Sequence, residues 1–388
     1  MSAEGVGAVA AGRILVVRTD NDGDVLLSGP AVRAVAGHAA HVTYLCAPSG
    51  AAAARLLPGV DDVLVWDPPW SGYAPPPVDG DDVLDLVARV RAGRFDAAVV
   101  FTSWHQSPLP TALLLRMAGV PRIAAASEDY PGSLLDVRHR ADRGTPQRPA
   151  AVHEVEAMLA LARAAGYPPH ADDDGRLAVR RPLPALPAPL DGVLAHGDRF
   201  VVVHPGASVP SRAPSAGTCA RLVTALAARG WCVVVTGGPG ERLLTRLVAG
   251  DTALDLGGRT DLAGLAAVLD AAAAVVVGNT GPAHLAAAVG TPVVSLFAPV
   301  VPRAWWEPYG VATRVLGDQD AACAATGARS CPVPGHPCLD GVPVAAVVDA
   351  VDEIARPAPP PAPRRPDAID LRVPLDIPEQ TSKATVST

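Results

Sequence analysis

Three aspartates, Asp20, Asp22 and Asp24, lie in one short loop, Arg18–Asp24 (RTDNDGD), which also contains Gly23. A carboxylate that a cleft keeps anionic can accept a proton from an attacking hydroxyl. The dipole of a helix that begins at this loop would favour the ionised form. Helix capping is the alternative interpretation, because Asp is a preferred N-cap residue. The loop therefore indicates either a general-base site or a helix cap.

A second loop, His204–Arg212 (HPGASVPSR), combines small residues with a cation. Gly206 permits a close approach of the backbone to a ligand, and Ser208 offers a hydroxyl. Arg212 offers a fork of donors that suits phosphate. The pattern indicates a diphosphate site, and a surface turn with a solvated arginine is the alternative.

A third loop, Gly278–His284 (GNTGPAH), follows one apolar run and opens another. Thr280 is a good N-cap residue, and Pro282 suits the first turn of a helix. The free N–H groups of such a turn bind anions, and His284 could reach the same anion. The alternative is a simple cap with a buried histidine in the core.

A fourth loop, Thr236–Glu241 (TGGPGE), also contains Gly237 and is expected at a strand end. The Glu241 carboxylate can accept hydrogen bonds from ribose hydroxyls. Alternatively, it is a first-turn glutamate that interacts with the helix dipole.

A fifth group contains Cys323, Cys331, His336 and Cys338, and these residue types are common zinc ligands. The spacing lacks the paired C-x2-C form of most zinc sites, so we expect packing and loop roles. A zinc site is the alternative.

These loops need strands to position them. Apolar runs that predict strands precede or include them, at Arg13–Val17, Phe200–His204, Trp231–Thr236 and Ala273–Gly278. Helical patterns follow, at Val25–Val35, Gly217–Arg229, Glu241–Ala249 and Pro282–Val289. Alternating strands and helices predict an α/β fold with parallel sheets. The carboxyl ends of such strands face the ligand crevice, which would bring the loops together.

Further strands are predicted at His41–Cys46, Val63–Val65, Ala97–Thr102 and Pro292–Phe297, and further helices at Ala51–Leu57, Val83–Ala92, Leu262–Ala272 and Val344–Ala355.

The proline-rich stretch Arg181–Gly192 lacks periodicity and divides the chain. We expect a loose leader (1–12), a Rossmann-like domain (13–180), a linker (181–197), a second Rossmann-like domain (198–342), a last helix that could cross back to the first domain (343–356) and a disordered tail (357–388).

The composition excludes several classes of protein. In 388 residues, 49% are apolar and 18% charged, which excludes a mainly disordered chain. The net charge of −7 and the lack of a basic stripe argue against a nucleic-acid partner. No apolar run reaches 18 residues, so we expect at most peripheral membrane contact. Without a signal-peptide pattern, the cytoplasm is the expected location. Six cysteines do not make a disulfide framework.

Taken together, the loops resemble those of glycosyltransferase family 9, the ADP-heptose:lipopolysaccharide heptosyltransferases. The resemblance runs from about Arg13 to Ala355 and rests on RILVVRTDNDGDVLLSGPAVRAV, HPGAS…R, TGGPGE, DLGGRTDLAGLAAVL and GNTGPAHLAAAVGTPVVSLFAP. It implies the GT-B fold, with two Rossmann-like domains facing a cleft. The acceptor would lie mostly on the first domain and the nucleotide sugar on the second.

The resemblance also implies residue roles. The Asp of the family's Gly-Asp-Val is Asp24, which makes it the general base. The family's basic residue after the first strand of the second domain falls on Arg212, and its hydroxyl contact to phosphate on Ser208. The family's Asp-Thr-Gly-x-x-His falls on Asn279, Thr280, Gly281 and His284. Asn279 departs from the family's Asp, because an amide can hydrogen bond but cannot act as a base.

The resulting hypothesis is an inverting glycosyltransferase that moves a heptose-like sugar from an ADP-linked donor to an acceptor hydroxyl. Neither a cofactor nor a metal is expected, because Arg212 and helix N-termini can stabilise the leaving diphosphate. The acceptor is a glycan, a lipid-linked sugar or a small molecule. Two alternatives are a GT-B-type nucleotide-sugar epimerase and a noncatalytic sugar-nucleotide-binding protein.

Overall fold

A computed structural model describes most of the chain, and its described residues, which end at Arg356, form one compact unit. The described residues are 12–72, 74–103, 105–140, 144–145, 148–149, 152–190, 193 and 199–356. Nearly all of the expected leader, part of the expected linker and the whole expected tail lie outside the described residues.

The first half contains a six-stranded sheet with the order β3-β2-β1-β4-β5-β6. Its strands are β1 (Arg13–Val17), β2 (His41–Cys46), β3 (Asp62–Val65), β4 (Ala97–Val100), β5 (Ile123–Ala126) and β6 (Val137–His139). All neighbours are parallel; Leu15, for example, is paired with both Thr43 and Ala98. The chain order reverses between β1 and β4, which is where an open α/β sheet offers its ligand crevice.

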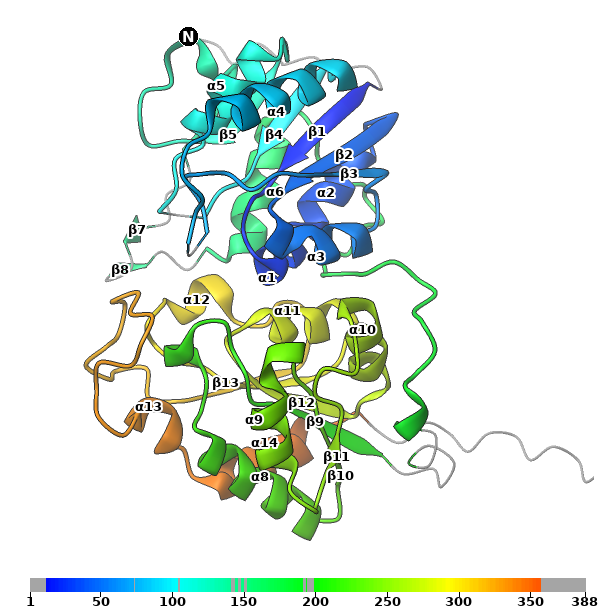
Figure 1. Ribbon diagram of the computed structural model, residues 1–388, viewed down its shortest axis with the longest axis vertical. Helices are drawn as coiled ribbons and strands as arrows, with labels where there is room; N and C mark the ends of the chain where they lie inside the picture. The colour runs from blue at the N-terminus through cyan, green and yellow to red at the C-terminus, as the bar shows by residue number, and fades with distance from the viewer. Residues whose placement is uncertain are drawn as a thin grey trace, which may run out of the picture. The chain divides into compact units, whose positions relative to one another are not determined.

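Helices cover both faces of this sheet (Figure 1). They are α1 (Asp22–Leu27), α2 (Gly29–Ala36), α3 (Ala51–Leu56), α4 (Gly80–Gly93), α5 (Leu109–Met117) and α6 (Glu154–Ala164). Side chains alternate across β1: Ile14 and Val16 lie in the core shared with α2 and α6, whereas Leu15 and Val17 lie in the core shared with α4 and α5. A short hairpin joins β7 (Gly144–Thr145) to β8 (Arg148–Pro149).

The second half repeats the same topology, with the order β11-β10-β9-β12-β13-β14 and parallel pairing throughout. Its strands are β9 (Phe200–His204), β10 (Cys232–Val235), β11 (Leu254–Asp255), β12 (Ala274–Gly278), β13 (Val293–Leu296) and β14 (Thr313–Leu316). Its helices are α8 (Ala216–Ala228), α9 (Arg242–Ala249), α10 (Leu262–Ala271), α11 (Gly281–Ala288), α12 (Arg303–Trp306), α13 (Pro337–Asp340) and α14 (Val344–Ile354). The order reverses between β9 and β12.

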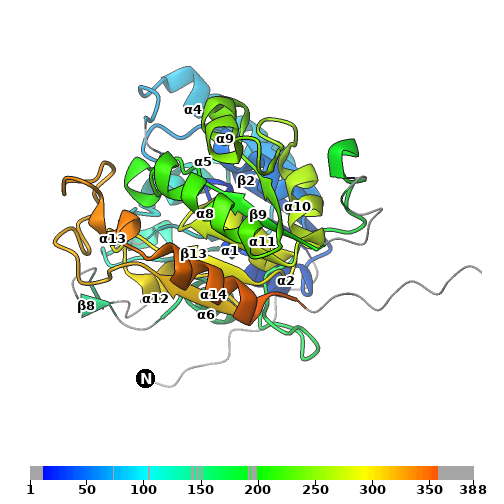
Figure 2. The same cartoon turned by 90° about the horizontal axis from the view of Figure 1, so that it is seen from below.

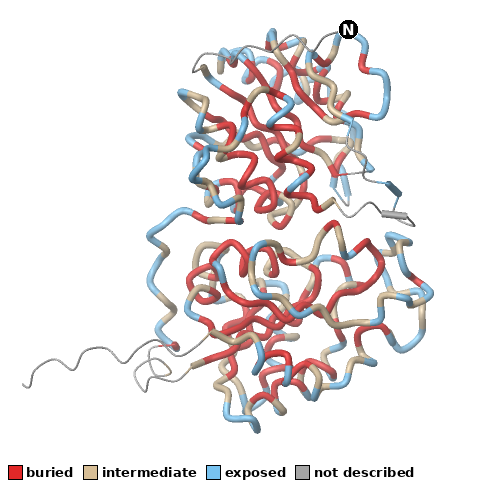
Figure 3. Tube along the Cα trace, turned by 180° about the vertical axis from the view of Figure 1, so that it is seen from behind, coloured by how far each residue is buried: buried red, intermediate tan, exposed pale blue. Residues whose placement is uncertain are grey.

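The buried positions follow the strands and the inner helix faces of both halves (Figure 3). Helices α10 and α11 cover one face of the second sheet and share a core with the first half, because α1 packs on α11 and α3 on α10. The expected α/β architecture with two parallel sheets is confirmed.

The last helix differs from the expectation that it crosses back to the first half. Helix α14 packs on α8 and on β12, β13 and β14 (Figure 2). Its apolar face, with Val347, Val348 and Val351, is buried in the core of the second half. That burial is the physical reason for its position.

The expected helix Val25–Val35 is two helices, α1 and α2, because the chain turns at Ser28. Pro30 stands in the first turn of α2 and lacks the N–H that a continuous helix would need. The Ser28 hydroxyl donates to the Val25 carbonyl instead and also pairs with the Tyr44 hydroxyl. Sequence patterns also missed β5, β6, β11, β14, α5, α6, α12 and α13.

Candidate functional site

A cavity of about 1550 Å³ lies at the carboxyl ends of both sheets. From the first half it is lined by the loops after β1 and β4, and from the second half by the loops after β9, β10 and β12. Both points of reversed strand order therefore open onto the same space.

Most of the predicted site residues line this cavity: Asp20, Asp22, Gly23, Asp24, Ser208, Arg212, Gly237, Glu241, Asn279, Thr280, Gly281 and His284. Gly206 and Thr236 are not among its lining residues. A Cβ atom at Gly206 would overlap the Glu241 carboxylate, so this glycine makes room for a side chain rather than for a ligand. Thr236 is fully buried, and its hydroxyl pairs with His204 Nδ1 at 3.0 Å.

The cation beside the predicted base is Arg18, whose side chain is fully buried. Its Nη2 donates to Asp24 Oδ1 at 3.2 Å and to the Ser103 hydroxyl at 3.2 Å. Its Nη1 donates to Glu154 Oε2 at 3.5 Å. Its Nε forms an ion pair with Asp20 Oδ2 at 3.0 Å, without the alignment of a hydrogen bond. The Arg18 guanidinium thus forms ion pairs with three carboxylates.

Asp24 and Asp20 both line the cavity, and Asp24 is the more exposed of the two, with about a quarter (24%) of its side chain accessible against 9% for Asp20. Burial raises the pKa of Asp24 to about 7. Arg18 and Arg212 act against this rise, whereas Asp20 and Glu154 add to it. The structure therefore differs from the expectation that Asp24 is held in its ionised form, because burial outweighs the attraction of Arg18 and Arg212. A carboxylate with a pKa near 7 suits proton transfer at neutral pH.

The two other aspartates of the loop have structural partners. Asp20 accepts hydrogen bonds from Ser103 and from Gln106 Nε2, at 3.1 and 2.7 Å. Asp22 Oδ1 accepts from the Ala53 N–H at 3.0 Å, near the start of α3. The alternative interpretation, a side-chain cap on the helix that begins at this loop, is not what the structure shows: the N-cap residue of α1 is Asn21, which makes no side-chain capping bond, and Asp22 bonds to α3 instead. Asp24 follows the N-cap residue Asn21 by three positions and contacts Arg18 instead.

Two glycines allow the halves to meet beside Asp24. A Cβ at Gly23 would lie 3.0 Å from Gly281 Cα and 3.2 Å from His284 Cδ2. The N-terminal turn of α11 therefore packs directly against α1. This contact places His284 next to the loop that carries the predicted base.

Two residues that line the cavity, Arg212 and His284, each have a buried nitrogen atom that is not hydrogen bonded to any described residue. Within the described ranges, Arg212 Nε and His284 Nδ1 are buried without a hydrogen-bond partner. Burial, followed by the neighbouring His153, Arg212 and Arg18, lowers the pKa of His284 to about 3, so its ring is neutral. Unpaired buried polar groups are costly, so a ligand that accepts hydrogen bonds fits here.

The N-terminus of α11 adds donors to the same region. Thr280 is its N-cap residue, and the Thr280 side chain makes no capping bond. Asn279 is buried and bridges two strand ends, because it accepts from the Ala298 N–H at 3.2 Å and donates to the Ala298 carbonyl at 3.5 Å. An aspartate could make the first of these bonds but not the second.

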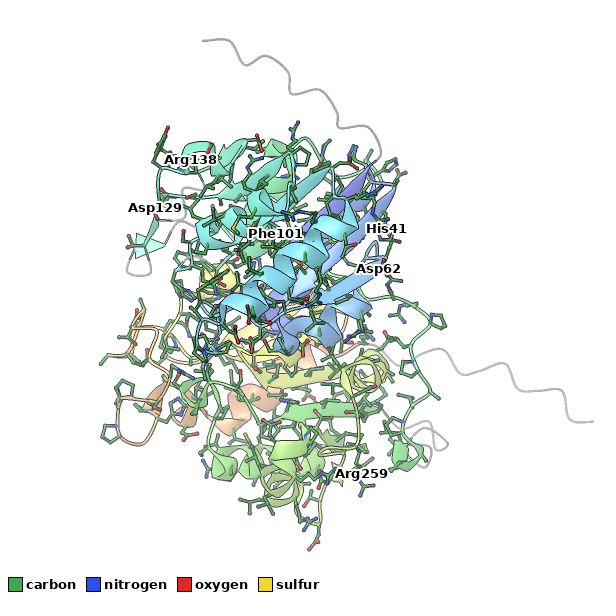
Figure 4. The ribbon with its side chains drawn as sticks, turned by 45° about the horizontal axis from the view of Figure 1, so that its top comes forward. His41, Asp62, Phe101, Asp129, Arg138 and Arg259 are labelled. Atoms are coloured by element: carbon green, nitrogen blue, oxygen red, sulfur yellow. The ribbon has the colours of Figure 1, made fainter. Side chains whose placement is uncertain are left out.

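The second half also supplies His204 and Glu241. The Glu241 carboxylate accepts from the Gly238 N–H at 2.7 Å and lies 4.0 Å from His204 Nε2. Burial lowers the pKa of His204, although Glu241 opposes this. Arg259, labelled in Figure 4, and Arg329 also line the cavity from this half.

Three of the four candidate zinc ligands lie near one another: burial, followed by the neighbouring Cys323 and Cys331, raises the pKa of Cys338 to about 11, and Cys323 and Cys338 are hydrogen bonded. His336 Nε2 is bonded to the Ser211 carbonyl at 3.1 Å, and Cys331 Sγ donates to the Val333 carbonyl. Cys323 and Cys338 are buried in the second-half core. In the part of the chain that the structure describes, no three His, Cys, Asp or Glu residues are placed to hold a metal ion.

Sequence reasoning missed Arg18 and Glu154. Glu154 is the first residue of α6, and a helical signal was present there: Val155, Met158, Leu159 and Ala162 follow the i, i+3, i+4, i+7 spacing.

Every helix in the described ranges is too short or too polar to cross a bilayer.

Comparison with known proteins adds a family match. The model of glycosyltransferase family 9 (heptosyltransferase) matches residues 83–336. Lipopolysaccharide heptosyltransferase 3 of Escherichia coli is 30% identical over 119 residues, which are 29% of this chain and 35% of that protein. The match thus spans about a third of that relative's length.

Two solved structures share the fold. The glycosyl transferase family 9 structure from Veillonella parvula has a TM-score of 0.70 and 18% identity, covering 89% of this chain and 98% of that one. The E. coli heptosyltransferase WaaC with ADP has a TM-score of 0.62 and 18% identity, covering 88% and 100%. The expected GT-B fold is confirmed.

Proposed function

Because this chain belongs to glycosyltransferase family 9, the heptosyltransferase family, we propose that it transfers a heptose-like sugar from an ADP-linked donor to an acceptor hydroxyl, with inversion. The observation that carries this proposal is the shared cavity. Asp24 enters it from the first half, and Arg212, His284 and the start of α11 enter it from the second. A base and a set of anion-binding groups thus face one space.

In the proposed reaction, the acceptor hydroxyl attacks the anomeric carbon of the donor and Asp24 takes its proton. The bond between that carbon and the diphosphate oxygen breaks, and ADP leaves with the electron pair. Arg212, the Ser208 hydroxyl and the N–H groups at Thr280–Gly281 stabilise the charge that develops on the diphosphate. Because these groups bear that charge, the mechanism needs no metal ion.

The ADP part of the donor is supported by the heptosyltransferase WaaC, whose solved structure contains ADP. Glu241 is proposed to accept hydrogen bonds from the ribose, since its carboxylate borders the cavity beside Gly237. We place the acceptor on the first half, near Asp24, and propose that transfer takes place in the cytoplasm.

Thermal denaturation with different nucleotides tests the donor assignment. A ligand at about 100 times its dissociation constant adds roughly 2.7 kcal/mol to the free energy of unfolding. We expect ADP to raise the melting temperature by several degrees, and GDP, UDP and dTDP to raise it less at equal concentration. A larger shift with another nucleotide would reassign the base of the donor. No shift with any of the four at millimolar concentration would contradict a nucleotide-sugar site.

A further inference from the structure

The group around Arg18 carries more negative than positive charge. Arg18 contributes one positive charge, whereas Asp20, Asp24 and Glu154 can contribute three negative ones. The carboxylates of Asp20 and Glu154 are almost fully buried, with 9% and 1% of their side chains exposed. Like charges that share a buried site favour proton uptake by one of the group. Asp24 is the most exposed member, so its proton can exchange with the cavity.

Glu154 contacts Arg18 and acts on Asp24 by its charge, from a position behind the cavity wall. It lies at the start of α6, and His153 caps that helix by accepting from the Val155 N–H. It is absent from the residues that line the cavity. Its carboxylate contacts the Arg18 Nη1 atom, while Nη2 of the same guanidinium contacts Asp24.

We propose that Arg18 and Glu154 are positioning residues: Arg18 fixes the direction of the Asp24 carboxylate, and Glu154 keeps Asp24 able to accept a proton at neutral pH. This proposal rests on the proposed role of Asp24 in glycosyl transfer. The arginine alone would hold Asp24 as a poor base, because a neighbouring cation stabilises a carboxylate's charged form. The remote carboxylate of Glu154 offsets that cation without occupying the cavity.

The other groups around Asp24 do not replace Glu154. Asp20 belongs to the same loop and is held by Ser103 and Gln106. Arg212, from the loop after β9, favours the ionised form of Asp24. His284, from α11, is neutral near pH 7 and adds no charge. Glu154 is therefore the carboxylate whose removal changes the charge around Asp24 without touching the cavity lining.

Glu154→Gln tests this proposal, because glutamine keeps the size of the side chain and can still accept from Arg18. Glu156→Gln is the matched control: it removes the same charge from the same helix, but at an exposed side chain. The Asp24 titration is followed by NMR of protein carrying ¹³C-labelled aspartate carboxyls, with Asp24→Asn used for assignment. We expect the Asp24 midpoint to fall by about one pH unit in Glu154→Gln and to stay unchanged in Glu156→Gln.

Activity gives a second readout, as the rate of ADP release from ADP-heptose in the presence of glycan, lipid-linked and small-molecule acceptors. In Glu154→Gln the acid limb of the kcat/KM profile should move down by about one pH unit, with kcat on the plateau within about threefold of wild type. In Arg18→Lys, which keeps the charge but loses the planar fork, kcat should fall by about 10–100-fold while KM for ADP-heptose stays within about twofold.

These readouts separate the two proposals. If wild-type protein releases no ADP, the proposed function fails, and the carboxyl titration still decides the role of Glu154. An Asp24 midpoint that is the same in wild type and Glu154→Gln would overturn the inference. So would a midpoint that moves equally in Glu156→Gln.

Discussion

Asp24→Asn is expected to lower turnover by about 10²–10⁴-fold, the usual contribution of a positioned general base. The substitution keeps the shape of the side chain and its ability to accept from Arg18, and it removes the basicity. ADP affinity should change little, because the proposed diphosphate contacts belong to the second half. Rates with saturating donor, together with calorimetric titration of ADP, measure the two effects separately.

The stability of the same variant provides a check on folding. The pKa of Asp24 in the folded protein, about 7, lies above its ordinary value of 3.8, so the stability of the fold falls as the pH rises from about 4 to about 7 and stays at the lower value above that. Asparagine never ionises. We therefore expect Asp24→Asn to melt at or above the wild-type temperature at pH 8, and this advantage to shrink toward pH 4.

Asp85→Asn is a suitable control, since it removes an exposed carboxylate on α4 of the same half. Its turnover should match wild type. Near-normal turnover in Asp24→Asn would remove Asp24 from the mechanism and make Asp20 and Asp22 the next candidates.

Arg212→Ala is expected to weaken ADP binding by about 10–100-fold, in line with the loss of hydrogen bonds to a charged group. Turnover should fall as well, because charge on the diphosphate grows in the transition state. The acid limb of the pH profile should also move up, since Arg212 favours the ionised form of Asp24. Titration calorimetry with ADP and a kcat/KM profile measure these effects.

Arg246→Ala is the matched control, because Arg246 lies exposed on α9 and outside the cavity lining. It should leave ADP affinity unchanged. Equal affinity in Arg212→Ala and wild type would place the diphosphate elsewhere in the cavity, near Arg259 or Arg329.

The sequence was sufficient to predict four of the loops that line the cavity, those after β1, β9, β10 and β12, but not the loop after β4. Each loop follows an apolar run that reads as a buried parallel strand, and the carboxyl ends of such strands meet at one edge. Asp24, Arg212 and Thr280 could therefore be assigned to one site. The role of Arg212 gains support from its unpaired Nε atom, which no sequence pattern shows.

Long-range contacts could not be predicted in the same way. Arg18 stands at a strand end and reads as an ordinary polar loop residue, yet its partner Glu154 is 136 positions away. Nothing in the sequence shows that Asp24 becomes buried, and this burial raises its pKa above the ordinary value of an aspartate. Gly206 was read as a ligand contact, because the Glu241 side chain that fills its space comes from another loop. Such contacts depend on how elements pack, not on their own patterns.

The most direct test of glycosyl transfer is the fate of ADP-heptose incubated with the protein and with neutral-glycan, lipid-linked or small-molecule acceptors. Separation of the nucleotides should show ADP rising as ADP-heptose falls, at a rate that drops by about 10²–10⁴-fold in Asp24→Asn. An intact nucleotide sugar with an altered stereocentre would contradict transfer and indicate an epimerase. A donor that binds and stays unchanged with every acceptor would contradict it as well and indicate a binding protein.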